Sequence, residues 1–301
     1  MRKIFFSLSF SILAIAAWAQ PASAQYAPTA EENSLLWEIS GNGIQAPSYL
    51  FGTIHMIGKE DFFLTEATKA SFEKAQRVTF EIDMEDMTDF TKLFPLLMKS
   101  FMANDTTLED LLTPEDYALV QEHFESVGLP MMFLNRIKPM FLSALGEGDM
   151  TSMDGSSGDV MSYEMELMSM AQQRKLPIDG LETAEFQMSV FDSIPYKVQA
   201  EMLVESIKTE DTGEGQFEQM VKLYKNQDLQ GMQSMMESEE GGIGGYEDLL
   251  LVGRNRNWIP VMAGMMAERP TFFAVGAGHL GGGQGVVALL REAGYTVKPL
   301  R

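Results

Sequence analysis

The stretch that decides the fold of this chain is Thr271-Phe272-Phe273-Ala274-Val275-Gly276-Ala277-Gly278-His279. Its first five residues form a continuous apolar run, which is typical of a strand buried on both faces of a sheet. We expect a glycine-rich turn over residues 276–283 to follow, then a helix over 285–293 and a last strand over 295–297. This alternation predicts α/β structure at the C-terminal end of the chain.

A similar unit lies near the N-terminus, where Ser48–His55 is expected to form a strand that ends at His55. Another strand is expected over residues 34–39, across a turn rich in glycine, asparagine and proline. Residues 77–83 are expected to form a further buried strand, and residues 176–182 a short one. Strands are therefore expected at both ends of the chain.

The middle of the chain, from about residue 86 to 267, has apolar residues at three- and four-residue steps, which indicates helices. The strand near 176–182 and the glycine-rich residues 241–245 interrupt this helical insertion. We therefore predict an α/β fold in which a central mixed β-sheet, built from N- and C-terminal segments, is flanked by helices. Residues 25–301 are predicted to form a single domain.

Two of the three histidines follow a glycine by three positions, in Gly52–His55 and Gly276–His279. Both motifs stand at the predicted end of a strand, where ligands gather in α/β sheets and where glycine permits a close approach of the backbone. His55 and His279 could then meet across one crevice. The alternative is that each only closes a strand end by hydrogen bonding. The third, His123, is predicted to lie on a helix surface.

Glu81 lies inside an apolar strand, where a carboxylate is costly unless it is paired or bound to a cation. Two neutral imidazoles and a carboxylate suit a divalent transition metal with open positions for water. Such an ion could activate water and polarise a carbonyl group. Asp83 faces the same side of the strand and could be a ligand, a general base or a solvated strand end. Whether Glu81 is ligand or base stays open.

Several segments together closely resemble the TraB/GumN family, which includes the TIKI proteins and is related to the erythromycin-esterase/ChaN-like superfamily. The segments are Leu36–His55, Phe80–Asp83, Gly180–Thr183 followed by Gln187, Arg254–Trp258 and Val275–Leu280. The resemblance implies a fold of that type with one active centre. In the best-studied animal members that centre is a metal-dependent peptidase site that favours manganese or cobalt.

The resemblance also implies roles for individual residues. His55, Glu81 and His279 match the core positions of the family. Glu182 and Arg254 match further recurring polar positions, and Tyr163-Glu164 matches a Tyr-Glu pair of many bacterial members.

Arg254 has a physical use beside a carboxylate-rich centre, because a guanidinium can clamp a substrate carboxylate or stabilise a developing oxyanion. The alternative is a structural ion pair with Glu182 or Glu81.

Composition excludes several classes of partner. The chain has 22 Lys and Arg against 43 Asp and Glu, a formal net charge of −21. Nucleic acid and anionic membrane surfaces are therefore poor partners. There is no cysteine, so no disulfide stabilises the fold.

The N-terminus is typical of a secretory signal peptide. A basic start at Arg2 and Lys3, an apolar run over 4–18 and the small residues Ala22-Ser23-Ala24 predict cleavage after Ala24. Residues 17–19 form a second candidate cleavage site. We expect the protein to be exported, to the periplasm of a Gram-negative bacterium, with no stable membrane span after cleavage.

The leading hypothesis is an exported metal-dependent hydrolase of the peptidase class, whose metal is held by His55, His279 and Glu81. The metal would be manganese, cobalt or zinc, and the substrate a peptide or small molecule. Glu81 or Asp83 would accept the proton of the attacking water, with Arg254 and Glu182 as further catalytic residues. A non-catalytic periplasmic binding protein for a peptide, signal or haem-like ligand is the alternative. The oligomeric state is not predicted.

Methionine clusters at 161–170 and 232–236 could indicate a copper(I) carrier. Flexible core filling on amphipathic helices is the favoured interpretation.

Overall fold

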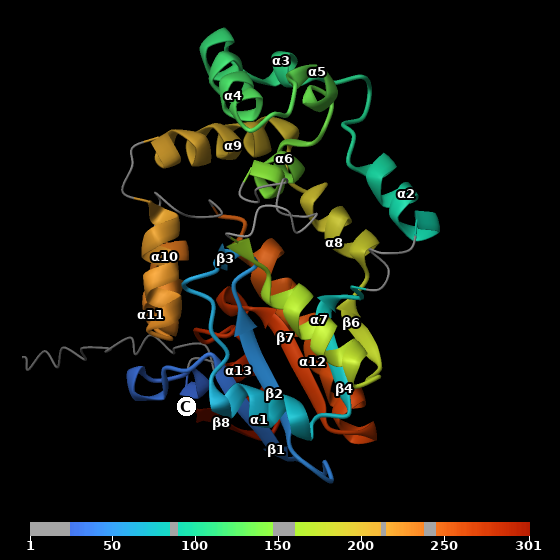
Figure 1. Cartoon of the computed structure of the whole chain (residues 1–301), viewed down its shortest axis with the longest axis vertical. Helices are drawn as coiled ribbons and strands as arrows, with labels where there is room; N and C mark the ends of the chain where they lie inside the picture. The colour runs from blue at the N-terminus through green and yellow to red at the C-terminus, as the bar shows by residue number, and fades with distance from the viewer. Residues whose placement is uncertain (1–24, 85–89, 147–159, 212–214, 238–244) are drawn as a thin grey trace, which may run out of the picture.

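The computed structural model describes residues 25–84, 90–146, 160–211, 215–237 and 245–301. In these residues a six-stranded mixed sheet of order β6-β4-β7-β2-β1-β8 lies at the centre and is flanked by helices, so the predicted fold class is confirmed (Figure 1). The strands are β1 (Leu36–Gly41), β2 (Ser48–Thr53), β4 (Arg77–Ile82), β6 (Ile178–Glu182), β7 (Thr271–Gly276) and β8 (Tyr295–Leu300). A small second sheet pairs β3 (Ile57–Gly58) with β5 (Val160–Met161).

Four neighbouring strands, β6, β4, β7 and β2, run parallel, whereas β1 is antiparallel to both β2 and β8. The register pairs Thr53 with Gly276 and Ile82 with Glu182. The carboxyl ends of all four parallel strands therefore lie along one edge of the sheet, as expected for a site built at strand ends.

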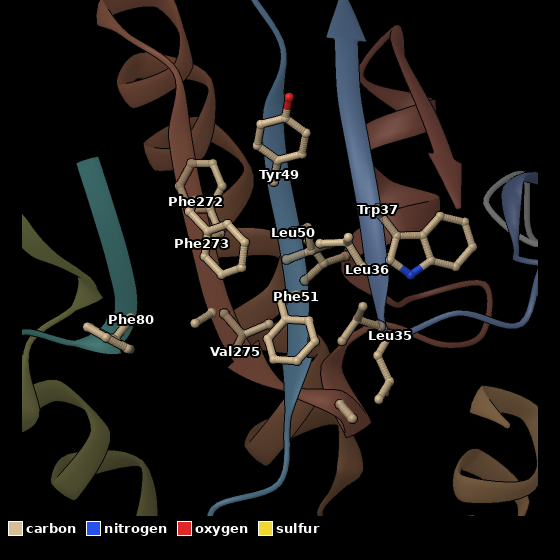
Figure 2. Close-up of a cluster of buried hydrophobic side chains, with 14 of the residues drawn as sticks. Leu35, Leu36, Trp37, Tyr49, Leu50, Phe51, Phe80, Phe272, Phe273 and Val275 are labelled. Carbon is tan, nitrogen blue, oxygen red and sulfur yellow. The ribbon is translucent and has the colours of Figure 1, made fainter. Parts of the chain in front are cut away.

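Both faces of the sheet are covered, which explains the unbroken apolar runs of its central strands. Helices α1 (Glu66–Lys74) and α7 (Tyr163–Gln173) cover one face, and α12 (Gly253–Glu268) and α13 (Val286–Glu292) cover the other (Figure 1). On the first face the ring of Phe272 packs edge-on against Phe72 of α1, with centroids 5.2 Å apart. Figure 2 shows the core residues of β1, β2 and β7 side by side.

The remaining helices stand beyond the carboxyl edge of the sheet, except for the last two in chain order, which stand beside it (Figure 1). They are α2 (Phe90–Lys99), α3 (Leu108–Leu111), α4 (Pro114–Ser126), α5 (Met131–Leu134), α6 (Pro139–Gly146), α8 (Ala184–Phe191), α9 (Tyr196–Asp211), α10 (Gln216–Lys225) and α11 (Leu229–Glu237). Some of them share a separate hydrophobic cluster, centred on Val120, Phe124 and Leu203. The single-domain organisation stays a prediction.

Element boundaries differ from the expected ones in two places. The strand expected to reach His55 ends at Thr53, so His55 lies in the loop after β2. Residues 131–145, which belong to the middle of the chain expected to be helical, do not form one continuous helix: the chain is interrupted between α5 and α6, where Lys138 precedes Pro139. A residue before proline is disfavoured in the helical region, so the chain restarts its helix at the proline.

The predicted signal peptide, residues 1–24, and most of the glycine-rich segment 241–245 lie outside the described residues. In the described ranges, no helix is both long and apolar enough to cross a bilayer.

Candidate functional site

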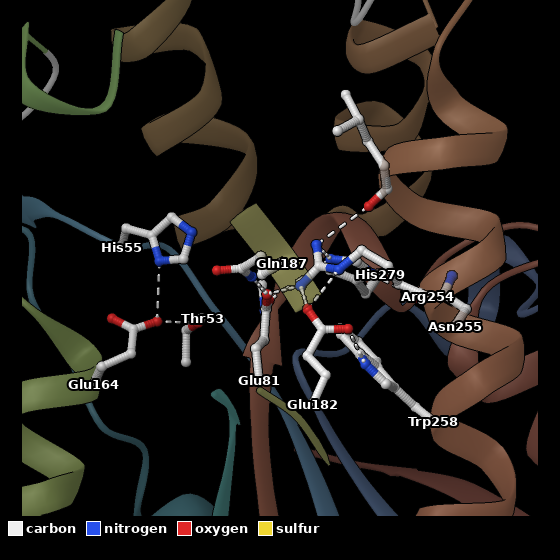
Figure 3. Close-up of polar contacts among 12 residues, drawn as sticks. Thr53, His55, Glu81, Glu164, Glu182, Gln187, Arg254, Asn255, Trp258 and His279 are labelled. Carbon is white, nitrogen blue, oxygen red and sulfur yellow. Dashed lines mark hydrogen bonds and ion pairs between the residues drawn. The ribbon is translucent and has the colours of Figure 1, made fainter. Parts of the chain in front are cut away.

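The carboxyl edge of the parallel strands brings two glutamates onto one arginine (Figure 3). Glu81 of β4 and Glu182 of β6 both contact Nη2 of Arg254, which reaches in from α12. The Oε2 atom of Glu81 lies 2.5 Å from Nη2 and Oε1 of Glu182 lies 2.7 Å from it. A second bond, 2.8 Å long, runs from Nε of Arg254 to Oε1 of Glu182. The three side chains are 8%, 13% and 5% exposed for Arg254, Glu81 and Glu182.

The arginine thus forms ion pairs with both glutamates at once, whereas the sequence left these pairings as alternatives. The three ionised groups sum to one excess negative charge. Because this charge lies in a buried place, it favours a further cation or a polarised ligand nearby.

His279 completes this cluster from the 3₁₀ turn η5 (Ala277–His279) directly after β7. Its Nδ1 atom lies 2.6 Å from Oδ1 of Asn255. Its Nε2 atom lies 3.3 Å from Nη1 of Arg254 and 3.6 Å from Oε1 of Glu81. The imidazole is buried, and its ring centroid is 4.5 Å from that of Trp258. The ring is therefore fixed on three sides.

Electrostatics give Glu81 and His279 opposite protonation behaviour. Burial would raise the pKa of Glu81, but positive charge on His279, Arg254 and His55 and the N–H of Gly276 lower it to about 2. Burial lowers the pKa of His279 to about 4. The negative charge of Glu81 raises this pKa, but the positive charges of Arg254 and His55 lower it further, so the net shift is downward. At neutral pH Glu81 is therefore a carboxylate and His279 a neutral imidazole.

His55 does not join the ion-paired cluster directly. Its side chain is 77% exposed, and its Nδ1 atom lies 3.3 Å from Oε1 of Glu164. That carboxylate also accepts hydrogen bonds from Thr53, at 2.7 Å, and from Ser162, at 3.1 Å. His55 is nevertheless close enough for its charge to lower the pKa of both Glu81 and His279. Figure 3 shows it across from Glu81, on the side opposite Arg254.

Close packing explains why the two Gly-x-x-His motifs begin with glycine. A Cβ atom on Gly52 would lie 2.7 Å from Leu280 and 3.1 Å from the backbone of Ala277. A Cβ atom on Gly276 would lie 3.3 Å from Oε1 of Glu81, the same atom that accepts a 2.8 Å hydrogen bond from the Gly276 N–H. Glycine therefore lets the two strand ends approach each other and the carboxylate.

One helical turn of α12 supplies most of the remaining contacts. Arg254 and Trp258 are four residues apart and so share a helix face, with the guanidinium 4.9 Å from the indole centroid. The indole N–H of Trp258 donates to Oε2 of Glu182 at 2.9 Å. A π-helical turn, η4 (Asp248–Val252), precedes α12, and the carbonyl of Leu250 accepts from Nη1 of Arg254 at 3.2 Å. Such irregular turns are frequent at functional sites.

Sequence reasoning assigned no role to Asn255, Trp258, Thr53 or Gln187, although Gln187 donates to Oε2 of Glu81 at 3.2 Å. The spacing of Arg254 and Trp258 was the available signal, since it places both on one helix face.

Three other candidates have different surroundings. Asp83 lies half-buried just past the end of β4. Tyr163 is buried in the core, and its hydroxyl donates to the carbonyl of Phe63. His123 lies on α4 with its ring against Phe124. The methionines Met168 and Met232 pack in the main hydrophobic core, which favours the core-filling interpretation.

The donors fit a metal ion in part. Among the described residues, no group of three or more His, Cys, Asp and Glu side chains is arranged to hold a metal. The 3.6 Å between Nε2 of His279 and Oε1 of Glu81 is nonetheless suitable for two ligands of one ion. Bonds of about 2.1 Å place neighbouring donors roughly 3.4 Å apart around a tetrahedral ion. A third donor would have to come from another side chain, and His55 is the nearest imidazole across the site.

Comparison with known proteins identifies the family of this chain. The profile of the TraB/PrgY/gumN family matches residues 35–299. "Metalloprotease TIKI1" of Danio rerio is 23% identical over 325 residues, which cover 90% of this chain and 64% of that protein. "Metalloprotease TIKI2" of Danio rerio is 22% identical over 320 residues, covering 88% and 61%. "Metalloprotease TIKI1" of Homo sapiens is 23% identical over 322 residues, covering 89% and 62%.

This chain thus spans a little under two thirds of the length of these relatives. No solved structure matches it.

Proposed function

This chain belongs to the TraB/PrgY/gumN family, and from that premise we propose that it is an exported metal-dependent hydrolase that cleaves peptide bonds. The similarity to proteins named metalloproteases supports the reaction class. The observation that carries the proposal is the 3.6 Å approach of Nε2 of His279 to Oε1 of Glu81, beside a guanidinium and with one excess negative charge. Those features suit a divalent cation and a substrate whose oxygen gains negative charge.

We propose that Glu81 and His279 hold the ion and that His55 supplies the third donor by turning towards them. A divalent ion bound there would supply Lewis-acid polarisation of a carbonyl and acidify a water molecule. His279 can bind without losing a proton, because its pKa of about 4 keeps it neutral at pH 7.

Each of the other side chains at the site has a proposed role in the reaction. Glu81, with a pKa of about 2, is a weak proton acceptor, which favours the ligand role over the general-base role. Asp83, beyond the end of the same strand, is the proposed base. Arg254 lies with Nη1 beside His279 and would stabilise negative charge on a substrate oxygen. Glu182 holds that guanidinium in place by its two contacts.

Metal analysis tests the proposal. After equilibration with manganese, cobalt or zinc and removal of free ion, we expect the purified protein to retain one equivalent of metal, measured by mass spectrometry. Glu81→Gln and His279→Gln should each reduce the retained metal, and His55→Gln should weaken retention. His123→Gln is the matched control, because His123 lies on α4 against Phe124 and should leave retention unchanged. Metal content unaffected by the combined His55→Ala and His279→Ala substitutions would sink the proposal.

A binding protein without turnover is the second candidate. One observation favours it, namely that Arg254 already neutralises part of the charge that would attract a metal. Incubation of the metal-equilibrated protein with a peptide library distinguishes the two. Cleavage that depends on His279 indicates a hydrolase, and retention of peptides without cleavage indicates a binding protein.

Export belongs to the same proposal and has its own test. When the full chain is expressed in a Gram-negative bacterium, the protein recovered from the periplasm should begin at Gln25 by N-terminal sequencing. Protein that stays in the cytoplasm with Met1 in place would contradict the predicted signal.

A further inference from the structure

Asn255 is held in one orientation by contacts at both ends of its amide. Its Nδ2 atom donates to the backbone carbonyl of Gln284 at 2.9 Å, and its Oδ1 atom lies 2.6 Å from Nδ1 of His279. A carbonyl oxygen can only accept, so the NH₂ group of Asn255 must face Gln284. The amide oxygen therefore faces the imidazole, and the side chain is only 2% exposed.

This orientation decides which nitrogen of His279 carries the proton. Two acceptors 2.6 Å apart would repel each other, so Nδ1 must be the protonated nitrogen that donates to Oδ1 of Asn255. In the neutral ring Nε2 then has a lone pair. That lone pair lies on the side of Glu81 and accepts from Nη1 of Arg254.

We infer that Asn255 is a positioning residue that locks His279 in the Nδ1–H tautomer and so presents the Nε2 lone pair to the site. The functional meaning rests on the proposed function, because a metal ligand needs a lone pair at that atom. The tautomer itself does not depend on it. Histidines that bind metals commonly donate their other ring N–H to a fixed acceptor, and that partner sets the tautomer and the ring orientation.

The two histidines of the Gly-x-x-His motifs differ in the group that lies beside Nδ1. Nδ1 of His55 lies beside a carboxylate, Glu164, whereas Nδ1 of His279 lies beside a neutral amide. A neutral partner suits the His279 position, where Arg254 is already within 3.3 Å of the ring. His55 therefore serves as an internal reference, since a change at Asn255 touches one histidine and leaves the other unaltered.

Long-range proton–nitrogen correlation spectra of the metal-free protein at pH 8 test the lock, because they distinguish the two neutral tautomers. The His279 signal is the one that disappears in His279→Gln. We expect the Nδ1–H pattern in the natural protein. Asn255→Leu should shift His279 towards Nε2–H, because Oε1 of Glu81 is then the strongest acceptor left beside the ring. His279 found as Nε2–H in the natural protein, or as Nδ1–H in both proteins, overturns the inference.

Two further variants separate the lock from a merely structural role. Asn255→Asp keeps an acceptor beside Nδ1 but loses the donor to Gln284, so it should retain the Nδ1–H tautomer. Arg256→Met removes the neighbouring 2.7 Å bond to the side chain of Gln284 and does not contact His279. It should leave the His279 spectrum unchanged. A tautomer shift in Arg256→Met would attribute the effect to movement of the Gln284 segment and overturn the inference.

Metal affinity provides the functional readout. We expect Asn255→Leu to bind zinc about 10- to 100-fold more weakly than the natural protein, with Asn255→Asp recovering much of the loss. If the natural protein binds no metal at all, the proposed function fails, and the spectra still decide the tautomer lock. If metal affinity is the same in Asn255→Leu and in the natural protein, Asn255 is not a positioning residue for a metal ligand.

Discussion

Replacement of Arg254 by methionine is expected to lower the free energy of unfolding by about 3–5 kcal/mol, because it leaves buried carboxylates without their counter-ion. Glu81 and Glu182 have side chains only 13% and 5% exposed, and both make their ion pair with this one guanidinium. Methionine keeps the aliphatic part of the side chain, so the loss is mainly electrostatic. Urea unfolding at pH 7, followed by circular dichroism, measures it.

The pH dependence of that loss has a defined sign. In the natural protein the pKa of Glu81 is lowered to about 2, so its ionised form stabilises the fold above its ordinary pKa. That stabilisation disappears as the pH falls from about 4.5 to about 2. In Arg254→Met, Glu81 loses this partner and accepts a proton more readily. The difference in the free energy of unfolding between the natural protein and Arg254→Met should therefore be largest near pH 7 and become smaller below pH 4.5.

A divalent cation should oppose the effect of Arg254→Met, because it can replace the lost positive charge between Glu81 and His279. Zinc at about 100 times its dissociation constant would restore about 2.7 kcal/mol. Arg256→Met is the matched control, since Arg256 is an exposed arginine on the same helix and bonds the side chain of Gln284. A similar stability loss in both variants, or none in Arg254→Met, would contradict the assigned role of the guanidinium.

The layered fold follows from features that a sequence displays directly. Phe272 and Phe273 point to opposite faces of β7 and are both fully buried, so the unbroken apolar run marks a central strand. The approach of His279 to Glu81 follows from the same reasoning, because parallel strands end at one edge. Gly52 and Gly276 stand out in the sequence because each precedes a histidine by three positions. In the structure a larger residue at Gly52 would collide with Leu280, and one at Gly276 would crowd the carboxylate of Glu81.

Other parts of the site depend on distant contacts that no local pattern contains. Arg254 meets Glu182 across 72 residues and Glu81 across 173, and the sequence offered these partners only as alternatives. The position of His55 could not be predicted either, because it depends on where β2 ends and on Glu164, which lies 109 residues further along the chain. The break before Pro139 could have been found, since proline restricts the preceding residue.

The indole of Trp258 packs against the site and contacts three of its residues. Trp258 is fully buried, contacts the ring of His279, lies under the guanidinium of Arg254 and donates to Glu182. His279, Arg254 and Glu182 therefore share one indole as a neighbour. Loss of the indole should therefore affect stability and metal affinity together.

Trp258→Ala is expected to lower the free energy of unfolding by about 3–5 kcal/mol, because it opens a large cavity in a core that cannot fully collapse. Trp258→Phe retains most of the ring and removes only the N–H, so Oε2 of Glu182 loses its donor at a cost of about 1–3 kcal/mol. Both variants should also bind zinc more weakly, since the imidazole of His279 and the guanidinium of Arg254 lose the surface that orients them. Chemical unfolding and zinc titration of the same preparations measure the two effects.

The chain supplies a closely matched control in Trp37. This tryptophan is also fully buried, donates its indole N–H to a backbone carbonyl at 2.8 Å, and has Arg291 5.5 Å from its ring centroid. It lies on β1, which β2 separates from β7 and β4, the strands that position His279 and Glu81. Trp37→Phe and Trp258→Phe should therefore destabilise the protein to similar extents, but only Trp258→Phe should weaken zinc binding. Equal zinc affinities in the two variants would mean that the indole supports the fold alone, and that the geometry of His279 and Arg254 is maintained without it.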